Sequence, residues 1–303
     1  MSTSTEPLSA QAQVQAQLAA QGLDPDAVVA LVRAALAEDL SLGPDVTTEA
    51  TVAPDVRGTG LLVSRASGVL AGVSVGATVF AVLGADTGAD VRVRIERADG
   101  ERVAGGDVVM SAEGPVRLLL TAERTMINLV GMLSGVATLT ARWVDAVAGT
   151  SAQIRDTRKT VPGMRALQKY AVRCGGGVNH RMGLGDAALI KDNHVAAAGG
   201  VRAAYDAVRR HAPDVAVQVE CDTLDQVREA IAAGARFVLL DNMSTAQLAQ
   251  AVALARPAGV RLEASGGLSL ERAAQVAATG VDYLAVGALT HSAPVLDLGF
   301  DLS

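Results

Sequence analysis

The hydrophobic pattern changes character near residue 150. From Gln153 onward, short apolar runs alternate with amphipathic stretches every 20–30 residues or so, the spacing of βα units. The expected strands are 153–156, 188–191, 216–220, 237–241, 261–264 and 283–286, and the expected helices are 200–211, 224–233, 245–255 and 270–279. About six units are fewer than the eight of a full TIM barrel, which leaves an incomplete barrel or an open doubly wound sheet. No Gly-x-Gly-x-x-Gly opens a βα turn, which disfavours a dinucleotide fold.

The chain before residue 150 predicts a different domain. Residues 56–120 hold short apolar or alternating runs punctuated by glycine, as in a small α+β region with an antiparallel sheet. A long apolar helix is expected over 122–139, where Gly131 and Gly135 would let another helix approach closely. Residues 1–22 are polar and are expected to form a disordered or loosely helical tail.

Composition excludes several classes of protein. A chain of 303 residues allows two domains, and its net charge of −6 with 2% aromatic residues argues against nucleic-acid binding. Two cysteines without metal-type spacing suit a reducing cytoplasm. We find neither a secretory signal nor an apolar run of transmembrane length, so we expect a cytoplasmic protein without membrane contact.

Positive charge gathers in residues 153–194, which hold eight basic and three acidic residues and all three lysines of the chain. An excess of this kind indicates either an anionic ligand or a solvated basic face. The glycine run at 174–177 within it is either a lid over a ligand or an ordinary connection.

Polar residues or glycine follow every expected strand. They are Thr157, Arg158 and Lys159, then Lys191, Glu220, Asp241, Ser265-Gly266-Gly267, and Gly287 with His291. Any one of them has a structural explanation, such as a helix cap at Glu220 or a turn at Gly266. Because the carboxyl ends of strands in a βα barrel share one face, the whole set predicts an active site there.

The residue types indicate a polyanionic substrate. The cations Arg158, Lys159, Arg181 and Lys191 suit carboxylates or phosphates, and the glycine turns suit a phosphate. Glu220 and Asp241 suit sugar hydroxyls, a divalent metal or a developing positive charge.

Several motifs together resemble the quinolinate phosphoribosyltransferase family, also called carboxylating nicotinate-nucleotide pyrophosphorylases. They are EDLSLGPDVTT (38–48), AERTMINLVGMLSGVAT (122–138), DTRKTVPGMRALQKYAVRCGGGVNHRMGL (156–184), IKDNH (190–194), VEC (219–221), LLDNM (239–243), EASGGL (263–268) and VGALTH (286–291). The resemblance covers roughly residues 25–300.

The resemblance implies an α/β fold of two domains. An N-terminal α/β sandwich (23–133) would be completed by the tail 292–303, and 134–291 would form an incomplete, open βα barrel of about six strands. It also implies a homodimer, or a higher oligomer, in which Arg124 reaches the neighbouring subunit's site. The reaction would join quinolinate to phosphoribosyl pyrophosphate with Mg²⁺, giving nicotinate mononucleotide, pyrophosphate and CO₂ for de novo NAD synthesis.

The resemblance also implies roles for single residues. Quinolinate would be held by Arg124, Arg158, His180, Arg181 and Lys191, with Thr157 close by, and Lys159 would approach the pyrophosphate. Glu220 and Asp241 would hold the ribose hydroxyls and, indirectly, substrate-bound Mg²⁺. The 5′-phosphate would lie on Ser265, Gly266, Gly267, Val286, Gly287 and Ala288, near His291. Lys159, Lys191, Glu220 and Asp241 would be the catalytic residues.

Three other functions stay open from the sequence. The first is phosphoribosyl transfer to nicotinate or another heteroaromatic acid, although so many cations exceed the need of one carboxylate. The second is an aldolase that forms a Schiff base on Lys191. The third is an anion-binding scaffold without catalysis.

Overall fold

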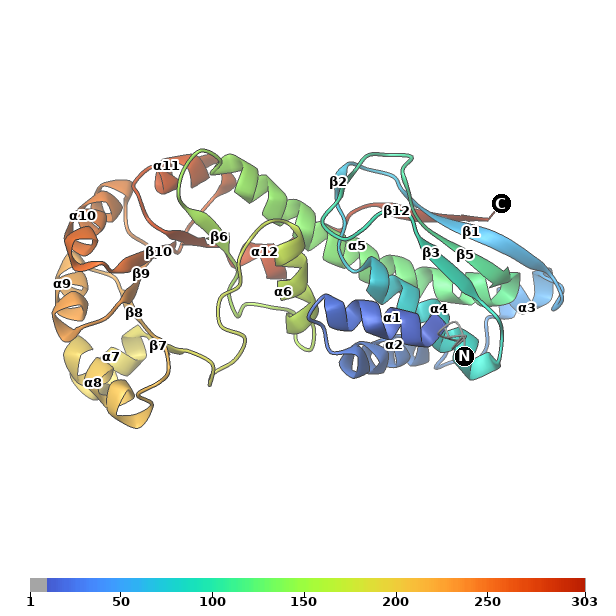
Figure 1. Cartoon of the computed structure of the whole chain (residues 1–303), viewed down its shortest axis with the longest axis horizontal. Coiled ribbons are helices and arrows are strands. Elements are labelled where there is room, and N and C mark those ends of the chain that lie inside the picture. The colour runs from blue at the N-terminus through green and yellow to red at the C-terminus, as the bar shows by residue number, and fades with distance from the viewer. Residues whose placement is uncertain (1–9, 303) are drawn as a thin grey trace, which may run out of the picture. The chain divides into compact units, whose positions relative to one another are not determined.

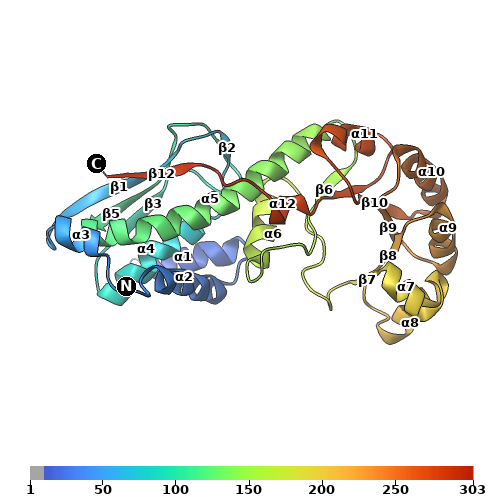
Figure 2. The same cartoon turned by 180° about the vertical axis from the view of Figure 1, so that it is seen from behind.

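A computed structural model describes residues 10–302, and its chain divides into two compact units (Figures 1 and 2). The first unit comprises the chain up to Thr138 together with Ala166–Gly175 and the C-terminal segment from Ala293. The second comprises Leu139–Arg165 and Gly176–Ser292. Each unit has its own sheet and its own core.

The first unit is built on an antiparallel sheet of four strands in the order β12-β1-β5-β3. The strands are β1 (Arg57–Ser64), β3 (Arg92–Ile95), β5 (Val108–Pro115) and β12 (Leu298–Leu302), and β2 (Gly68–Val69) pairs with β4 (Arg102–Val103) as a separate ribbon. β12 pairs with β1 from Gly60↔Leu302 to Ser64↔Leu298, so the C-terminal end of the chain forms an edge of this sheet.

The first unit also contains helices. They are α1 (Ala10–Ala20), α2 (Pro25–Asp39), α3 (Val46–Thr51), α4 (Val73–Thr87), the first part of α5 (Val116–Ala146), and α6 (Arg165–Cys174). α4 packs on β3 and β5, and α1 and α2 pack on α4. Every residue of α4 from Val73 to Gly84 is buried, which follows from its place between a sheet and two helices.

The N-terminal tail was expected to be disordered or loosely helical, and its residues 10–20 are helical and form α1, so the disordered alternative is wrong for them; residues 1–9 lie outside the described part of the chain. Val14 and Leu18 stand four residues apart, so they share one face of the helix and are both buried. Two apolar residues among alanines and glutamines are a weak periodic signal. Contact with α4 stabilises this helix, and sequence pattern alone does not show that contact.

α5 is long and apolar enough to span a membrane by length and composition, but 67% of its most apolar window is buried inside the fold, as in a core helix. The hydroxyls of Ser134 and Thr138 accept hydrogen bonds from Ala71 N and Val69 N, at 3.0 and 2.9 Å, which holds α5 against the segment after β2. The close approach predicted at Gly131 and Gly135 exists, but its partner is the extended C-terminal segment and not a helix. A Cβ at Gly135 would overlap the Pro294 carbonyl.

α6 also differs from expectation, because its contacts place it in the first unit although the sequence analysis included it in the barrel range. The Tyr170 hydroxyl donates to Asp99 Oδ2 at 2.7 Å. Burial of the tyrosine and the charge of Asp99 raise the pKa of this hydroxyl far above its usual range. It therefore stays protonated and keeps donating.

The second unit is a parallel sheet of six strands in the order β6-β11-β10-β9-β8-β7. The strands are β6 (Gln153–Arg155), β7 (Ala188–Ile190), β8 (Val217–Cys221), β9 (Phe237–Asp241), β10 (Arg261–Ser265) and β11 (Tyr283–Ala285). β6 and β7 are the two edges, and between the described residues of these two strands no pairing closes the sheet. The sheet is thus an open, incomplete βα barrel, as the resemblance predicts.

Helices of the second unit follow the strands, and those between β7 and β11 lie along the outer side of the curved sheet in both views (Figures 1 and 2). They are α7 (Asp192–Ala198), α8 (Val201–His211), α9 (Leu224–Ala233), α10 (Thr245–Ala255), the 3₁₀ turns η1 (Arg256–Ala258) and η2 (Leu270–Arg272), α11 (Ala273–Ala277) and α12 (Ala288–His291). Capping boxes begin α9 and α10, with Thr223 and Ser244 as the caps. These caps explain why both helices begin where the sequence predicts.

Candidate active site

The carboxyl ends of the six parallel strands surround a cavity of ≈ 380 Å³ in the second unit. Nine of the predicted site residues line it: Thr157, Arg158, Lys159, His180, Arg181, Lys191, Glu220, Asp241 and Ser265. Leu189, Leu239, Glu263 and Ala285 complete the wall. Four of these strands, β6 to β9, thus bring together the cations and the acids that the sequence predicted to meet.

Asp156, buried at the end of β6, anchors the first part of the cavity wall. Its carboxylate accepts from the His180 backbone N–H at 2.7 Å and from the Asn179 side chain at 2.5 Å. These bonds hold the segment after α6 beside β6, so that His180 and Arg181 enter the same cavity as Arg158 and Lys159. The residues after β6 and the segment after α6 therefore form one wall of the cavity.

Arg158 offers an unused donor to this cavity. Its Nε is buried, and no acceptor for it exists within residues 10–302. A buried guanidinium donor without a partner is costly, because it has lost its water and gained no hydrogen bond. Such a donor fits an anionic ligand that supplies the acceptor.

The crowding of cations is visible at Arg181. Burial and the charge of the nearby Arg158 both lower the pKa of its guanidinium. One of its amino groups, Nη1, donates to the Ala187 carbonyl at 2.9 Å. Two guanidinium groups that repel one another in a half-buried wall would both be stabilised by a dianion.

The acids stand across two neighbouring strands. Glu220 Oε2 lies 3.5 Å from Lys191 Nζ, and the Glu220 side chain is 14% exposed. Burial raises the pKa of Glu220, the charge of Lys191 lowers it, and the charge of Asp241 raises it again. Asp241 accepts from the side-chain amide of Asn242 at 2.6 Å. Glu220 and Asp241 therefore act on each other as like charges that a shared cation or hydroxyl donor would relieve.

Asn242 was not predicted as a site residue. Its φ of 53° makes it the one non-glycine residue between 10 and 302 in the left-handed region, and its backbone N–H donates to Ser265 O at 2.9 Å. A Cβ at Gly266 would overlap the Asn242 side chain. Strained backbone of this kind gathers at functional sites. The motif that follows β9 therefore shapes the turn after β10.

The remaining predicted residues lie outside the cavity wall. Gly287 is close to it, because a Cβ there would stand 3.0 Å from Lys159 Cδ and 3.3 Å from His291 Nε2. Thr290 Oγ1 donates to Lys159 O at 2.8 Å, which ties α12 to the loop after β6. Gly267, Val286 and Ala288 belong to the same two turns but do not line the cavity.

Arg124 belongs to the first unit, on α5, and its side chain is 64% exposed. The structure of one chain therefore does not bring it into the cavity wall. Its predicted role depends on a second subunit.

Glu263 is the acid that the sequence analysis missed. It is wholly buried on β10; its Oε2 accepts from Arg155 Nη1 at 2.7 Å and from Gln218 Nε2 at 3.2 Å. Its Oε1 has no hydrogen-bond partner within the described chain and lies 3.6 Å from His180 Nε2. Burial raises the pKa of Glu263, and Arg155 opposes this. A glutamate inside an apolar strand, in the motif EASGG, was the signal available in the sequence.

His180 is held by this buried group. Its Nδ1 accepts from the Arg181 backbone N–H at 2.7 Å, and its Nε2 lies 2.9 Å from Gln218 Oε1. The first bond requires an unprotonated Nδ1, so the proton of a neutral ring is on Nε2 and is donated to Gln218. The ring is thereby fixed at the base of the cavity.

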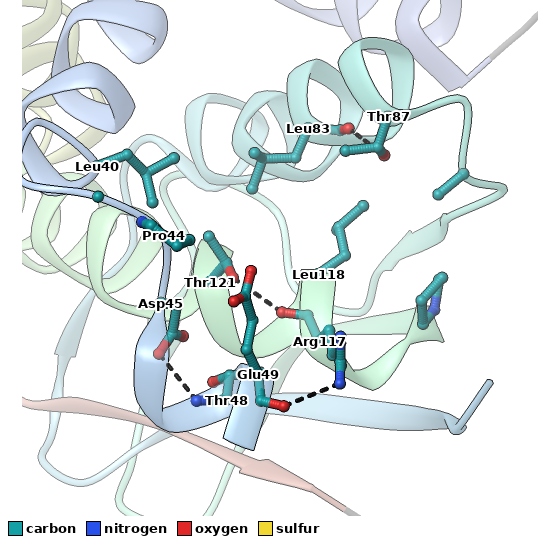
Figure 3. Close-up of a pocket in the computed structure, with 13 residues that line it drawn as sticks. Leu40, Pro44, Asp45, Thr48, Glu49, Leu83, Thr87, Arg117, Leu118 and Thr121 are labelled. Atoms are coloured by element: carbon teal, nitrogen blue, oxygen red, sulfur yellow. Dashed lines mark hydrogen bonds between the residues drawn. The ribbon is translucent and has the colours of Figure 1, made fainter. Parts of the chain in front are cut away.

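A larger cavity of ≈ 630 Å³ lies in the first unit, where Leu40, Pro44, Leu83 and Leu118 form much of the wall (Figure 3). Its polar groups are engaged locally. Asp45 caps α3 by accepting from Thr48 N at 3.0 Å, which lowers the pKa of Asp45. Arg117 donates to the Val52 and Glu49 carbonyls. The charged residues that it does contain, Asp45, Glu49 and Arg117, are fewer than those of the barrel cavity, and Asp45 and Arg117 are bonded to backbone groups of the same unit.

Both parts of the chain are similar to known proteins. The model of the quinolinate phosphoribosyl transferase C-terminal domain matches residues 136–301, and that of the N-terminal domain matches residues 45–134. The chain is 55% identical over 280 residues to a nicotinate-nucleotide pyrophosphorylase [carboxylating] of Mycobacterium leprae, covering 91% of this chain and 98% of the relative. It is 40% identical over 243 residues to a probable enzyme of the same name from Bacillus subtilis, covering 80% and 82%.

Solved structures agree with these matches. A NadC structure from Streptococcus pyogenes superposes with a TM-score of 0.87 at 38% identity, covering 93% of this chain and 98% of that one. The nicotinate-nucleotide pyrophosphorylase of Francisella tularensis gives a TM-score of 0.85 at 38% identity, covering 92% and 96%. Because both domain models match and these relatives are similar over most of their length, the chain belongs to the quinolinate phosphoribosyltransferase family.

Proposed function

We propose that this chain transfers the phosphoribosyl group of phosphoribosyl pyrophosphate to quinolinate and releases CO₂, as the names of its relatives describe for them. The products are nicotinate mononucleotide and pyrophosphate, and the pathway is de novo NAD synthesis. One observation carries the proposal: Arg158, Lys159, Arg181 and Lys191 share a single cavity with Glu220 and Asp241. The cations suit a substrate pair rich in negative charge, and the acids suit a sugar that becomes cationic during transfer.

Quinolinate carries two adjacent carboxylates, and the cavity offers cationic donors for both of them. Arg158, with its unpartnered buried Nε, and Arg181 donate to one carboxylate of the dianion, and Lys191 in the same wall donates to the other. Arginine binds a carboxylate through two parallel N–H donors, which fixes the plane of the ring as well as its position. Orientation of this kind is the larger part of catalysis when two substrates must meet in line.

Transfer begins when the pyridine nitrogen attacks C1′ of the ribose and the bond from C1′ to the pyrophosphate oxygen breaks. Lys159 neutralises the leaving group, whose electron pair stays on oxygen. Glu220 and Asp241 hold the ribose hydroxyls and favour the positive charge that develops at C1′. Burial raises the pKa of Glu220 and Lys191 opposes this, so Lys191 helps to keep the glutamate ionised for this role.

Decarboxylation follows on the same ring. Transfer leaves a cationic ring nitrogen, so the carbon–carboxylate bond beside it can break with its electron pair retained on the ring carbon. CO₂ leaves and a proton from solvent fills the position. The protein needs only to hold the carboxylates and exclude competing orientations, since the ring itself is the electron acceptor.

Mg²⁺ fits the donor set of the cavity. Among residues 10–302, no three His, Cys, Asp or Glu side chains are grouped as a metal site. Glu220 and Asp241 are two carboxylates beside a place for phosphates, and Mg²⁺ commonly keeps waters and takes one or two carboxylates together with substrate phosphates. When bound, the ion would neutralise the pyrophosphate. The two carboxylates would reach it directly or through the ribose hydroxyls and water.

The assembly and compartment belong to this proposal. Arg124 is exposed on α5, so it is free to enter the cavity of a neighbouring subunit in a homodimer. Two cysteines without a partner, one buried and one half-buried, suit a cytoplasmic protein.

The decisive assay measures pyrophosphate released from phosphoribosyl pyrophosphate with Mg²⁺ and either acid, together with CO₂ released when carboxyl-labelled quinolinate is the acceptor. We expect turnover with quinolinate and none with nicotinate, because a single carboxylate leaves part of the cationic wall unpaired. Turnover of nicotinate but not of quinolinate would replace the proposed substrate. Borohydride trapping of a carbonyl substrate on Lys191 would instead establish the Schiff-base chemistry of an aldolase.

A further inference from the structure

A second basic cavity of ≈ 520 Å³ lies in the barrel unit, at the amino ends of the strands. Its wall includes Val217 and Phe237, the first residues of β8 and β9, and Arg261, the first residue of β10. In a parallel sheet these strand beginnings lie opposite to the strand ends that carry Lys191, Glu220 and Asp241. We call this space the lower cavity.

The wall of the lower cavity is strongly one-sided in charge. It contains five arginines and no aspartate or glutamate: Arg155, Arg181, Arg209, Arg236 and Arg261. Arg155 is neutralised by Glu263. In the described chain no ion pair engages Arg209, Arg236 or Arg261. Three positive charges without a counter-charge thus face one space.

Structural duties occupy only a small part of these three side chains. Arg209 donates to Val215 O at 3.3 Å, Arg236 to Ala258 O at 2.8 Å, and Arg261 to the Tyr283 hydroxyl at 3.2 Å. A guanidinium has five N–H donors, so satisfying one acceptor each leaves most of them for another ligand. Helix C-termini near the amino ends of the strands attract cations by themselves, but they do not require three guanidinium groups around one cavity.

The wall also holds two aromatic rings. The guanidinium groups of Arg261 and Arg155 contact the Phe237 ring and lie 5.2 and 5.0 Å from its centroid. Tyr205 lines the cavity and is fixed by its hydroxyl, which donates to Gly234 O at 2.9 Å. Held aromatic rings beside free guanidinium groups match a ligand with a planar group and an anionic tail.

We propose that the lower cavity is a second ligand site, separate from the proposed catalytic cavity, that binds an organic phosphate of nucleotide size. Arg209, Arg236 and Arg261 bind the phosphates, and the wall formed by Tyr205 and Phe237 contacts the base. The volume falls within the range of small-molecule sites, roughly 300–1,000 Å³. The site does not depend on which heteroaromatic acid the enzyme uses.

The test must separate this site from the catalytic cavity, which also takes phosphates. His180 and Arg181 line both cavities, so neither is substituted. The variant is the double substitution Arg236→Gln with Arg261→Gln, which keeps a donor at each position. The matched control is Arg256→Gln. Arg256 is also an exposed arginine of this unit that donates to one carbonyl, Gly280 O at 3.1 Å, and it does not line the lower cavity.

Binding of ATP without Mg²⁺ to each full-length protein is measured by isothermal titration calorimetry. We expect the double variant to bind about tenfold more weakly or worse, since two charge-assisted phosphate contacts are lost. The control should bind like the unaltered protein, and the KM for phosphoribosyl pyrophosphate should be the same in all three. If the double variant loses its thermal unfolding transition, the two single substitutions are compared with the control in the same way.

Three results would overturn the proposal. ATP fails to bind the unaltered protein at millimolar concentration, the double variant binds as tightly as the unaltered protein, or the control weakens binding as much as the double variant. The second result would mean that the arginines serve only the carbonyls and that ATP occupies the catalytic cavity. The third would mean a general effect of charge.

Discussion

The buried pair of Arg155 and Glu263 allows a prediction in which pH tests the physical reason. Arg155→Met keeps much of the side-chain volume beside Phe237 and Tyr283 but removes the cation that lies 2.7 Å from Glu263 Oε2. Glu263 is then a fully buried carboxylate with Gln218 as its one remaining donor. Removing one partner of a buried ion pair costs about 3–5 kcal/mol, because an uncompensated charge remains.

The carboxyl group can avoid part of this cost by taking up a proton. Each pH unit above the ordinary pKa of 4.5 raises the free energy needed to protonate this carboxyl group by about 1.4 kcal/mol. The loss of stability is therefore limited to about 3.4 kcal/mol at pH 7 and to about 1.4 kcal/mol at pH 5.5. Burial raises the folded-state pKa, so stability is lost as pH rises from the unfolded value towards the folded one.

The assay is urea unfolding of the Arg155→Met variant and the unaltered protein at pH 5.5 and pH 7, followed by circular dichroism. We expect the difference in unfolding free energy to be about 3 kcal/mol at pH 7 and at least about 1 kcal/mol smaller at pH 5.5. When the double variant Arg155→Met with Glu263→Gln is compared with Glu263→Gln alone, the difference in unfolding free energy should not depend on pH. An equal loss at both pH values, or a loss below about 1 kcal/mol at pH 7, would refute the reasoning.

Other predictions concern the proposed reaction. Glu220→Gln should lower kcat/KM by about a hundredfold or more while the unfolding midpoint stays unchanged; because burial raises the pKa of Glu220, the acid limb of the unaltered enzyme's kcat/KM profile should lie above 4.5, with activity lost as pH falls through it. Arg124→Ala and Lys191→Ala should each be inactive alone, but mixed dimers should recover about a quarter of the activity, since one site in each heterodimer is complete; no recovery after subunit exchange, verified by native mass spectrometry, would place Arg124 in its own subunit's site. Removal of Mg²⁺ with EDTA should abolish CO₂ release without shifting the unfolding midpoint, and full turnover in EDTA would exclude the proposed ion.

The fold of the second unit was easier to predict from the sequence than the fold of the first. Strands of a parallel sheet are buried on both faces, so β8, β9 and β10 stand out as apolar runs, and a polar residue at the end of each falls on the same edge. The local pattern at each strand end therefore predicted that residues far apart in the sequence lie close together in the fold. Nine of the predicted residues line one cavity for this reason.

What the sequence could not supply were contacts between distant segments. Glu263 points into the barrel because of its register opposite Leu239 and Tyr283, and no local pattern contains that register. The partner of Gly131 and Gly135 is more than 150 residues away along the chain. The helix α1 carries two buried apolar residues, and its stability depends on α4. Long-range packing decided each of these cases.

The turn shared by Asn242 and Gly266 constrains how sequences of this kind can change. Position 242 has a φ of 53°, which few residues other than Gly, Asn and Asp adopt without strain, and the Asn242 side chain fills the space that a Cβ at 266 would need. Gly266 has a φ of 81°, and a Cβ there would also stand 2.9 Å from the backbone N of Asn242, so a side chain at 266 is excluded whichever residue occupies position 242. Variation at this turn is therefore confined to position 242, and there to residues that tolerate a φ of 53°.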